Sequence, residues 1–508
     1  MKGTSSFFSL LGLVHFAVGS HDGTRLERRA EGTAVVNLAQ TSGTPQHLAS
    51  GFIYGLPDNA DGSASTAIPS ELAEGTGYIY NRAGGAQLPS PSLGYASGQL
   101  TGRLRSFSSN YKTARSYGAG FQLLVHDLWG ADSVQGTIPW PGDNGNWAFF
   151  DTFLTQVIAY IKTNNLLSGL ELDLWNEPDA PQFWGASYDQ YLQTWTRMYQ
   201  RFKSEIPSVP ILGPSISQPP TTGNARWTAW LDHVKSTNTV PDKYTYHILT
   251  STGSAYIPRN AQDALKSMTS ARGMAMKPVS VNEYGAIDGG DQTNSASAWY
   301  IGAFEREGVS GLRAHWGMGA ANLHNGMAGL VNFSGSNYFR AAQWWVYNYY
   351  RHSMTGNRVA TTSSGDRLFE VYATRGSSAN SVKILTGLKS SAGDRVYDVR
   401  VTGLSAVGVS GTVKIRTLRF THVDWWLEGP APTDLGTVTH TVTNDEVTFF
   451  VDPDNQCKGL APRLAVCHGR IVDPAEPDLG NCSGKARDLG RALARDNQYT
   501  AYAFEFVS

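Results

Sequence analysis

LELDLWNEPD, residues 170–179, carries the strongest local signal in this 508-residue chain. Because side chains alternate across a strand, its three leucines share one face, and the odd-numbered residues from Glu171 to Glu177 share the other. Pro178 cannot continue a central strand, so Glu177 is expected at the carboxyl end of the strand. Barrels of parallel strands build their active sites at that end.

The surrounding 300 residues alternate between short apolar runs and helical patterns. The helix-like stretch 147–162 repeats apolar residues at the 3.6-residue period. The strand-like runs are 51–54, 121–126, 170–175, 211–212, 244–249, 279–283 and 312–316. This alternation predicts an α/β fold with a parallel sheet, and a closed (β/α)8 TIM barrel over 48–356 fits the length. A doubly wound sheet is the structural alternative.

A second carboxyl group lies in PVSVNEYG, residues 278–285, where Val279, Val281 and Glu283 are expected to share a face. Glu283 follows Glu177 by 106 residues (283 − 177), which is about three barrel units of roughly 31 residues each. If Glu177 ends the fourth strand, Glu283 therefore ends the seventh. The run that ends at Trp316 then supplies the eighth strand.

Counting back from Glu177 places the earlier strands. His126 is expected at the end of the third strand, Arg82 near the second, and Tyr54 near the first. The count therefore closes at eight strands.

Two carboxyl groups at strand ends across a barrel mouth suit the cleavage of an acetal. One protonates the leaving oxygen, and the other meets the oxocarbenium-like centre. Two close carboxyl groups push their pKa values apart, so that one is protonated while the other is ionised. The separation of the carboxyl groups is about 5–5.5 Å in retaining enzymes and about 6.5–9.5 Å in inverting ones.

At these motifs the chain resembles the clan A retaining glycoside hydrolases, and within them most nearly glycoside hydrolase family 39. The resemblance covers roughly residues 48–330. It rests on Asn176-Glu177-Pro178, on the wider stretch LWNEPDAPQFW (174–184), on Glu283 and on Trp316.

The resemblance implies that Glu177 is the acid/base and Glu283 the nucleophile. The residues that it implies around the nucleophile and the sugar are Arg82, His126, Asn176, His247 and Trp316. The clan often shows His-x-Tyr on the sixth strand, whereas this chain has His247-Ile248-Leu249. Tyr246 and Tyr284 are the candidate substitutes for the missing tyrosine. The motif NEYG on the seventh strand also differs from the usual motif of family 39.

Composition excludes several other classes of protein. The net charge is −1, which gives no electrostatic footprint for nucleic acid or an anionic membrane. Charged residues make up only 16% of the chain, and its 14 tryptophans supply flat apolar faces. Trp129, Trp184 and Trp316 are candidate platforms for sugar rings. No motif for a phosphate, a dinucleotide or a zinc ion is present, so no cofactor and no metal are expected.

The amino-terminal residues predict secretion. Lys2 precedes an apolar run over 7–18, which is too short to span a bilayer, and Ala17-Val18-Gly19 is a small-x-small cleavage signature. We expect a signal peptide over 1–19 and a mature start near Ser20 or Ala30, since Arg28-Arg29 could end a short pro-segment.

Beyond residue 357 the pattern becomes that of a β protein. Six strand-like runs separated by Gly, Ser, Asn and Asp predict an accessory antiparallel β-sandwich over 357–508. Within the preceding segment 20–47, the run 33–38 is expected to pair with these strands, because it has no place in an eight-fold count.

The tail over 457–498 lacks periodicity and is read either as an irregular insertion or as a real functional loop. It holds all three cysteines, Cys457, Cys467 and Cys482, so one bridge and one thiol is the simplest outcome. A flanking pairing of 446–451 with 499–507 would let the tail be deleted. Asn332-Phe333-Ser334 and Asn481-Cys482-Ser483 are N-glycosylation acceptors on a secreted chain.

The sequence therefore predicts a secreted retaining glycoside hydrolase that acts on a cell-wall polysaccharide or oligosaccharide. Its catalytic residues are Glu177 and Glu283. Its expected partner is a carbohydrate, with neither nucleic acid nor a membrane, and the oligomeric state is left open. The substrate-binding candidates are Asn176, His126, His247, Trp316, Arg82, Trp184 and Tyr284. The alternatives are an inverting hydrolase and a non-catalytic carbohydrate-binding protein on a barrel scaffold.

Overall fold

Eight parallel strands close into a barrel in the computed structural model. It describes residues 30–85, 93–130, 138–287, 289–316, 324–393, 395–451, 466–467, 470–471 and 499–507. The barrel strands are β2 (Gly51–Ile53), β3 (Tyr80–Ala83), β4 (Gly120–Leu124), β5 (Leu170–Asp173), β6 (Ile211–Ile216), β7 (Lys243–Ile248), β8 (Val279–Tyr284) and β9 (Ser310–Arg313). They follow one another around the barrel in chain order, and β9 returns to β2. The TIM barrel expected from the sequence is therefore confirmed.

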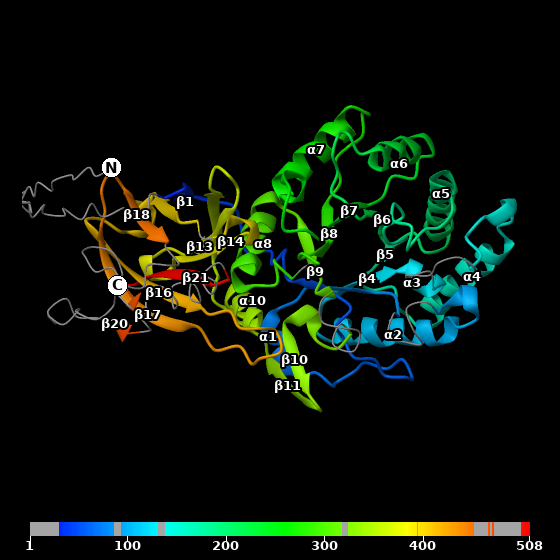
Figure 1. Ribbon diagram of the computed structural model, residues 1–508, viewed down its shortest axis with the longest axis horizontal. Coiled ribbons are helices and arrows are strands. Elements are labelled where there is room, and N and C mark those ends of the chain that lie inside the picture. The colour runs from blue at the N-terminus through cyan, green and yellow to red at the C-terminus, as the bar shows by residue number, and fades with distance from the viewer. Residues whose placement is uncertain are drawn as a thin grey trace, which may run out of the picture.

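Helices surround this barrel on its outside (Figure 1). They are α1 (Ser70–Thr76), α2 (Leu100–Ser116), α3 (Val125–Trp129), α4 (Ala148–Thr163), α5 (Tyr188–Glu205), α6 (Ala225–Ser236), α7 (Pro258–Ser270), α8 (Asn294–Glu307) and α10 (Ala342–His352). Several begin where the sequence supplies a cap. The Ser187 hydroxyl accepts a hydrogen bond from the Gln190 amide before α5, and Pro258 opens α7 with its preset φ. Within the described ranges, no helix combines the length and apolar character that crossing a bilayer requires.

A second, nine-stranded sheet forms the accessory domain. Its strands are β1 (Gly32–Thr41), β12 (Asn357–Thr362), β13 (Phe369–Arg375), β14 (Lys383–Leu388), β15 (Tyr397–Thr402), β16 (Thr412–Phe420), β17 (Thr433–Thr441), β18 (Glu446–Val451) and β21 (Ala501–Val507). The order in the sheet is β17-β16-β21-β14-β13-β12-β1-β15-β18. All pairs are antiparallel except β1 with β15.

Strand β1 lies inside this sheet, as expected for residues 33–38. It pairs with β12, where Val35 lies opposite Thr362, and with β15, where Val36 lies opposite Val401. Ala34, Val36 and Leu38 are fully buried in the core of this domain. The amino-terminal strand therefore joins strands more than 300 residues later in the chain.

The predicted pairing of 446–451 with 499–507 is wrong. Strand β18 pairs with β15, whereas β21 lies between β14 and β16. The two strands face each other across the sandwich core, where the rings of Phe449 and Phe504 are 4.7 Å apart. Strand order depends on contacts far apart in the sequence, which alternation alone does not encode. Of the tail, only β19 (Val466–Cys467) and β20 (Arg470–Ile471) are described, so the predictions about the tail and its cysteines otherwise lie outside the described residues.

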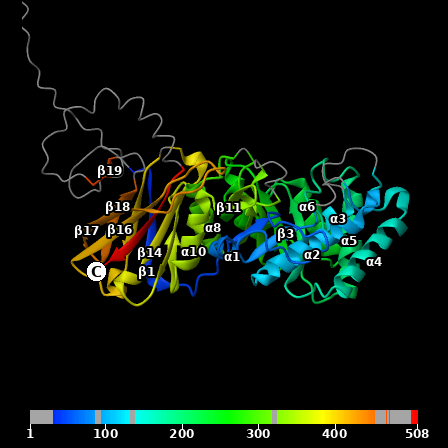
Figure 2. The same cartoon turned by 90° about the horizontal axis from the view of Figure 1, so that it is seen from below.

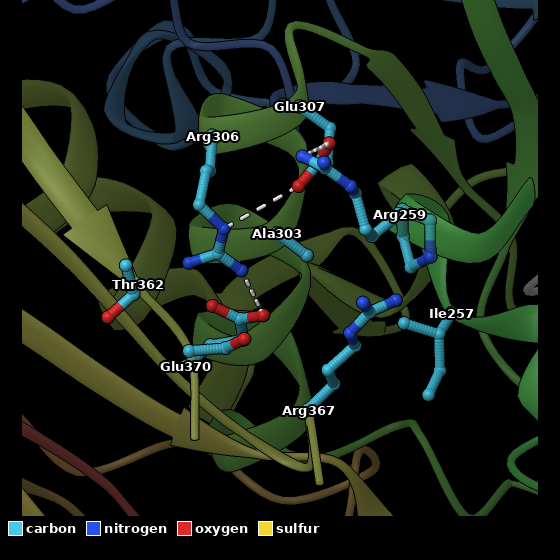
Figure 3. Close-up of a pocket in the computed structure, with 10 residues that line it drawn as sticks. Ile257, Arg259, Ala303, Arg306, Glu307, Thr362, Arg367 and Glu370 are labelled. Carbon is cyan, nitrogen blue, oxygen red and sulfur yellow. Dashed lines mark hydrogen bonds and ion pairs between the residues drawn. The ribbon is translucent and has the colours of Figure 1, made fainter. Parts of the chain in front are cut away.

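Helices α8 and α10 lie between the barrel and the sandwich (Figure 2). Helix α8 packs on β13 and β14. Beside this contact, a pocket opens between α7, α8, β12 and β13 (Figure 3). There Arg306 contacts both Glu370 and Glu307, and Glu307 also contacts Arg259. This interface pocket lies among ion pairs and is not where the two candidate catalytic residues meet.

A short hairpin of β10 (Val331–Ser334) and β11 (Asn337–Arg340) follows the last barrel strand. It contains Asn332, the first predicted glycosylation acceptor. The Asn332 side chain is buried, and its Nδ2 donates a hydrogen bond to the Trp425 carbonyl at 3.1 Å. The folded protein therefore covers the nitrogen to which a glycan would attach. Asn481 and the expected signal peptide lie outside the described residues.

Candidate active site

Glu177 lies just beyond the carboxyl end of β5, as the proline after it predicts. Its φ of +39° is uncommon for a residue other than glycine, and such backbone strain often marks functional sites. A hydrogen bond from its amide to the Ser215 carbonyl, 2.9 Å long, holds this conformation. The Glu177 carboxyl group then meets His247, whose Nδ1 lies 2.7 Å from its Oε1.

Glu283 reaches the same point from β8. Its Oε1 accepts a hydrogen bond from Arg82 Nη1 at 2.6 Å and lies 3.7 Å from His247 Nε2. One carboxylate oxygen from each glutamate and a ring nitrogen of His247 all lie within 4.8 Å of one another. The structure therefore brings together two carboxyl groups that are 106 residues apart (283 − 177).

A local irregularity in β8 directs Glu283 inward. The register with β9 shifts between Val281 and Tyr284. As a result, Asn282 and Glu283 both make contacts inside the barrel, Asn282 with Asp173 and Glu283 with Arg82. The expectation that Val279, Val281 and Glu283 share one face is therefore wrong, because a bulge interrupts the alternation.

Asp173 accepts hydrogen bonds from three side chains beneath the two glutamates. Its Oδ2 accepts hydrogen bonds from Arg82 Nε at 2.7 Å and from Asn282 Nδ2 at 2.8 Å, and its Oδ1 accepts one from Ser215 Oγ at 2.7 Å. The remaining arm of Arg82 donates to Asn176 Oδ1 at 2.9 Å. Arg82 is fully buried, so three acceptors fix its guanidinium against Glu283.

The roles of Asp173, Asn282 and Ser215 were not predicted from the sequence. Alternation places Asp173 inside the barrel, and this signal could have identified it as a partner of an inward arginine. No local signal distinguishes Asn282 or Ser215.

The two glutamates differ in their electrostatic surroundings. Burial raises the pKa of Glu177 to about 7, and the negative charge of Asp179 adds to the rise, while Arg82 opposes it. Burial also raises the pKa of Glu283, while His247 and Arg82 act in the opposite direction. Burial lowers the pKa of His247, which favours a neutral ring between the two carboxyl groups. Glu177 is thus suited to carry a proton, whereas the positive charge of Arg82 stabilises the anionic form of Glu283.

Three further predicted residues follow the carboxyl ends of barrel strands. Asn176 accepts from Arg82 and is therefore part of the network. His126 lies in the single turn of α3 after β4 rather than on the strand, and its ring packs on Trp175 with centroids 4.7 Å apart. Trp316, which follows β9, is partly exposed and contacts Tyr54 edge-on at 5.9 Å.

Other predicted residues are used in packing. Trp184 is buried against Trp140 and Trp175, and Trp129 is buried under α4. The Tyr284 hydroxyl donates to the Ala49 carbonyl at 2.8 Å and lies 2.5 Å from the Tyr347 hydroxyl, away from Glu283.

Tyr246, the other candidate substitute for the clan tyrosine, packs on Trp227.

Glu177, His247 and Glu283 could also hold a metal ion, since two carboxylates and one imidazole form a chelating set. However, the buried guanidinium of Arg82 lies 2.6 Å from Glu283 Oε1. The positive charge of Arg82 would repel a metal cation bound at Glu283. The arrangement therefore suits carboxyl chemistry better than metal binding.

Comparisons with known proteins give the following similarities. No protein-family model matches the sequence. The chain is 25% identical over 448 residues to a 3-O-β-L-arabinopyranosyl-α-L-arabinofuranosidase from Bifidobacterium pseudocatenulatum. The match covers 78% of this chain and 44% of that protein, so the chain spans less than half the length of this relative.

Two solved structures share the whole architecture. The protein N2152 from Neocallimastix frontalis matches with a TM-score of 0.65 and 18% identity, over 94% of this chain and 99% of that one. The GH39 enzyme from Xanthomonas axonopodis pv. citri matches with a TM-score of 0.51 and 16% identity, over 87% and 97%. The structural comparisons show that the chain has the fold of a GH39 enzyme, the family that the sequence motifs resemble.

Proposed function

We propose that the protein is a retaining glycoside hydrolase that cleaves O-glycosidic bonds by double displacement. The observation that carries the proposal is the approach of a Glu177 oxygen and a Glu283 oxygen to within 4.8 Å, beside His247. This gap is close to the roughly 5–5.5 Å that separates the carboxyl groups of retaining enzymes. An inverting enzyme needs room for a water molecule between them, at roughly 6.5–9.5 Å.

In the first step, a Glu283 oxygen attacks the anomeric carbon as the bond from that carbon to the leaving oxygen breaks. Protonated Glu177 donates its proton to the leaving oxygen, so the aglycone departs as a neutral alcohol. Arg82 favours the ionised form of Glu283 and orients it, because its guanidinium donates hydrogen bonds to both Glu283 and Asp173. The product of this step is a glycosyl ester on Glu283.

In the second step, the ionised Glu177 takes a proton from water, and the resulting hydroxide attacks the anomeric carbon and releases Glu283. Both displacements invert the centre, so the product retains its configuration. The raised pKa of Glu177, near 7, lets it hold a proton in the first step and recover it in the second.

We further propose that the enzyme is secreted and acts on cell-wall polysaccharide or oligosaccharide. The apolar amino-terminal run and its small-x-small signature support secretion. The arabinofuranosidase activity of the bacterial relative makes arabinofuranosyl groups the first sugars to test. An aryl-glycoside panel with α-L-arabinofuranosides and β-D-xylopyranosides, followed by NMR of the first-formed anomer, measures both sugar and stereochemistry. An inverted anomer would contradict the retaining mechanism, and a lack of turnover on every glycoside would favour the non-catalytic alternative.

The roles of the two glutamates are tested by substitution. Glu283→Ala should lower kcat by at least about 10⁴-fold, and azide should restore turnover with an inverted glycosyl azide, because a small anion fills the vacated space. Glu283→Gln is the matched control, since its amide fills that space and should block rescue.

Glu177→Ala should slow substrates with poor leaving groups far more than activated aryl glycosides, because activated groups leave without a proton. The kinetic measurement is kcat/KM against leaving-group pKa. Near wild-type activity of any of these variants on a natural substrate would contradict the assignment.

A further inference from the structure

The loop between β16 and β17 presents two large apolar side chains to water. Trp426 is 55% exposed and Leu427, next to it, is 49% exposed. Most large apolar residues bury their surface, because burial contributes about 25 cal/mol per Å². Among the described residues, the other large apolar side chains with comparable exposure are isolated along the chain: Phe149, Leu167 and Ile287.

The loop that carries Trp426 is anchored on both sides. Before it, the Trp425 carbonyl accepts from Asn332 Nδ2 at 3.1 Å. After it, the Gly429 amide donates to the Arg340 carbonyl at 2.8 Å, and the Gly429 carbonyl accepts from Trp345 Nε1 at 2.9 Å. The exposure of Trp426 is thus imposed by a fixed backbone. An anchored backbone loses little conformational freedom when a ligand binds to the side chains that it carries.

Ring contacts connect Trp426 to the end of a barrel strand next to the one that carries Glu283. The ring of Trp425 contacts Trp426 at 5.6 Å and His315 at 5.8 Å. His315 follows strand β9, whose neighbour β8 carries Glu283, and the Ala314 amide donates to the Tyr284 carbonyl at 2.8 Å. The sum of these steps, at about 3.3 Å per strand residue and about 4.8 Å between strands, gives an upper limit on the order of 20 Å for the distance between Trp426 and Glu283.

The loop therefore connects two strands of the sandwich, but it makes its contacts with residues of the barrel domain. Figure 1 shows it extending from the sandwich towards the hairpin β10–β11, which follows the last barrel strand. The surface near the carboxyl ends of the barrel strands is thus built by both domains.

We propose that Trp426 is a stacking platform for a sugar ring of a neutral oligosaccharide or polysaccharide, several units from the bond at the two glutamates. The inference rests on the proposed function and deepens it, because it makes the substrate a chain rather than a single glycoside. The negative face of an aromatic ring attracts the C–H groups that a sugar ring presents, and Leu427 extends the apolar contact.

The charges around the platform disfavour an acidic chain. Asp424 and Glu428 flank the two apolar residues, and both are exposed. Their carboxylates can accept hydrogen bonds from sugar hydroxyls, whereas they repel the carboxylates of an acidic polysaccharide.

Binding measurements on a protein that does not turn over test this proposal. The background is Glu283→Ala, and the probes are hexasaccharides of β-1,4-xylan, α-1,5-arabinan and β-1,4-glucan, with an oligogalacturonate as the acidic probe. Titration calorimetry should show binding of at least one neutral hexasaccharide. Trp426→Ala should weaken that binding by about tenfold, which corresponds to about 1.4 kcal/mol. Trp426→Phe should keep most of it, and the acidic probe should bind most weakly.

Two controls isolate the effect. Leu167→Ala removes an exposed leucine at the amino end of β5, and should leave binding unchanged. In the active protein, Trp426→Ala should raise KM for long chains and leave the hydrolysis of aryl glycosides unchanged.

Three outcomes would overturn the inference. They are binding unaffected by Trp426→Ala, failure of every neutral hexasaccharide to bind, and a dimer in sedimentation analysis that Trp426→Ala dissociates. Hydrolysis of aryl glycosides by the unmodified protein decides the proposed function separately.

Discussion

At the scale of single residues, the protonation of Glu177 depends on its neighbour Asp179. Burial is the larger cause of its raised pKa, near 7, and the Asp179 charge adds to it. A protonated acid is required for the first step, so kcat/KM should fall as the pH rises through about 7. Asp179→Asn removes the neighbouring charge and should move this alkaline limb to lower pH. The measurement is the pH profile of kcat/KM on a substrate with a poor leaving group.

Asp179 accepts hydrogen bonds from the amide and hydroxyl of Ser217, and asparagine can keep one acceptor oxygen there. The substitution should therefore alter charge more than structure. Asp189→Asn, which changes an exposed carboxylate on α5, is the matched control and should leave the profile in place. An alkaline limb that does not move in Asp179→Asn would contradict the electrostatic account.

The sequence predicted the two glutamates but only part of their surroundings. Alternation and the proline after Glu177 were sufficient to place that residue at a strand end. The strand count placed Arg82 near the second strand, but its role came from the family resemblance, because nothing in its own neighbourhood indicates that it reaches Asp173 and Glu283. Asn282 was missed because the bulge in β8 depends on pairing with β9, which is absent from the local pattern.

At the scale of elements, counting strand–helix units located the barrel correctly. The units vary in length, from 29 residues between the starts of β2 and β3 (80 − 51) to 50 between β4 and β5 (170 − 120). The spacing of 106 residues between Glu177 and Glu283 (283 − 177) was still close enough to three average units to number their strands. Strand ends were less predictable. His126 lies in α3 instead of β4, because the chain turns into a helix directly after Leu124.

Strand β1 offers a direct test of how the sandwich is held together. Val36 is fully buried between β12 and β15, whereas its neighbour Val35 points to the other face and is half-buried. Val36→Ala should lower the free energy of unfolding of the sandwich by about 2 kcal/mol, because it leaves a cavity in the core. Val35→Ala is the matched control on the same strand and should cost clearly less. Denaturant unfolding measures both, and equal losses would show that β1 does not contribute to the core through this face.

At the scale of the whole molecule, the sandwich was predicted as a class but not in its order of strands. The runs with turns between them were sufficient to predict strands. Which strand lies beside which depends on contacts across the whole domain, as in the separation of β18 from β21 by the width of the core. Two strands with similar alternating patterns are equally good partners on sequence alone.

The contact between the two domains includes a buried carboxyl group whose titration can be followed. Glu370 on β13 is 2% exposed and forms an ion pair with Arg306 on α8 (Figure 3). Burial raises its pKa from 4.5 to about 7, although Arg306 acts in the opposite direction. The folded state therefore binds this proton more tightly than the unfolded state does. The free energy of unfolding should consequently fall as the pH rises from about 4.5 to about 7.

Glu370→Gln cannot ionise and should lose this part of the pH dependence. The stability of the variant relative to the unmodified protein should then improve as the pH rises from 4.5 to 7.5, by up to about 3 kcal/mol for a shift of this size. Melting temperatures measured across that range test the prediction, and Glu74→Gln, at an exposed site on α1, serves as the control. If instead Glu370→Gln loses stability increasingly towards pH 7.5, the ion pair with Arg306 outweighs the cost of burying the charge. The domain contact would then be held by attraction between charges rather than by a carboxyl group that stays protonated.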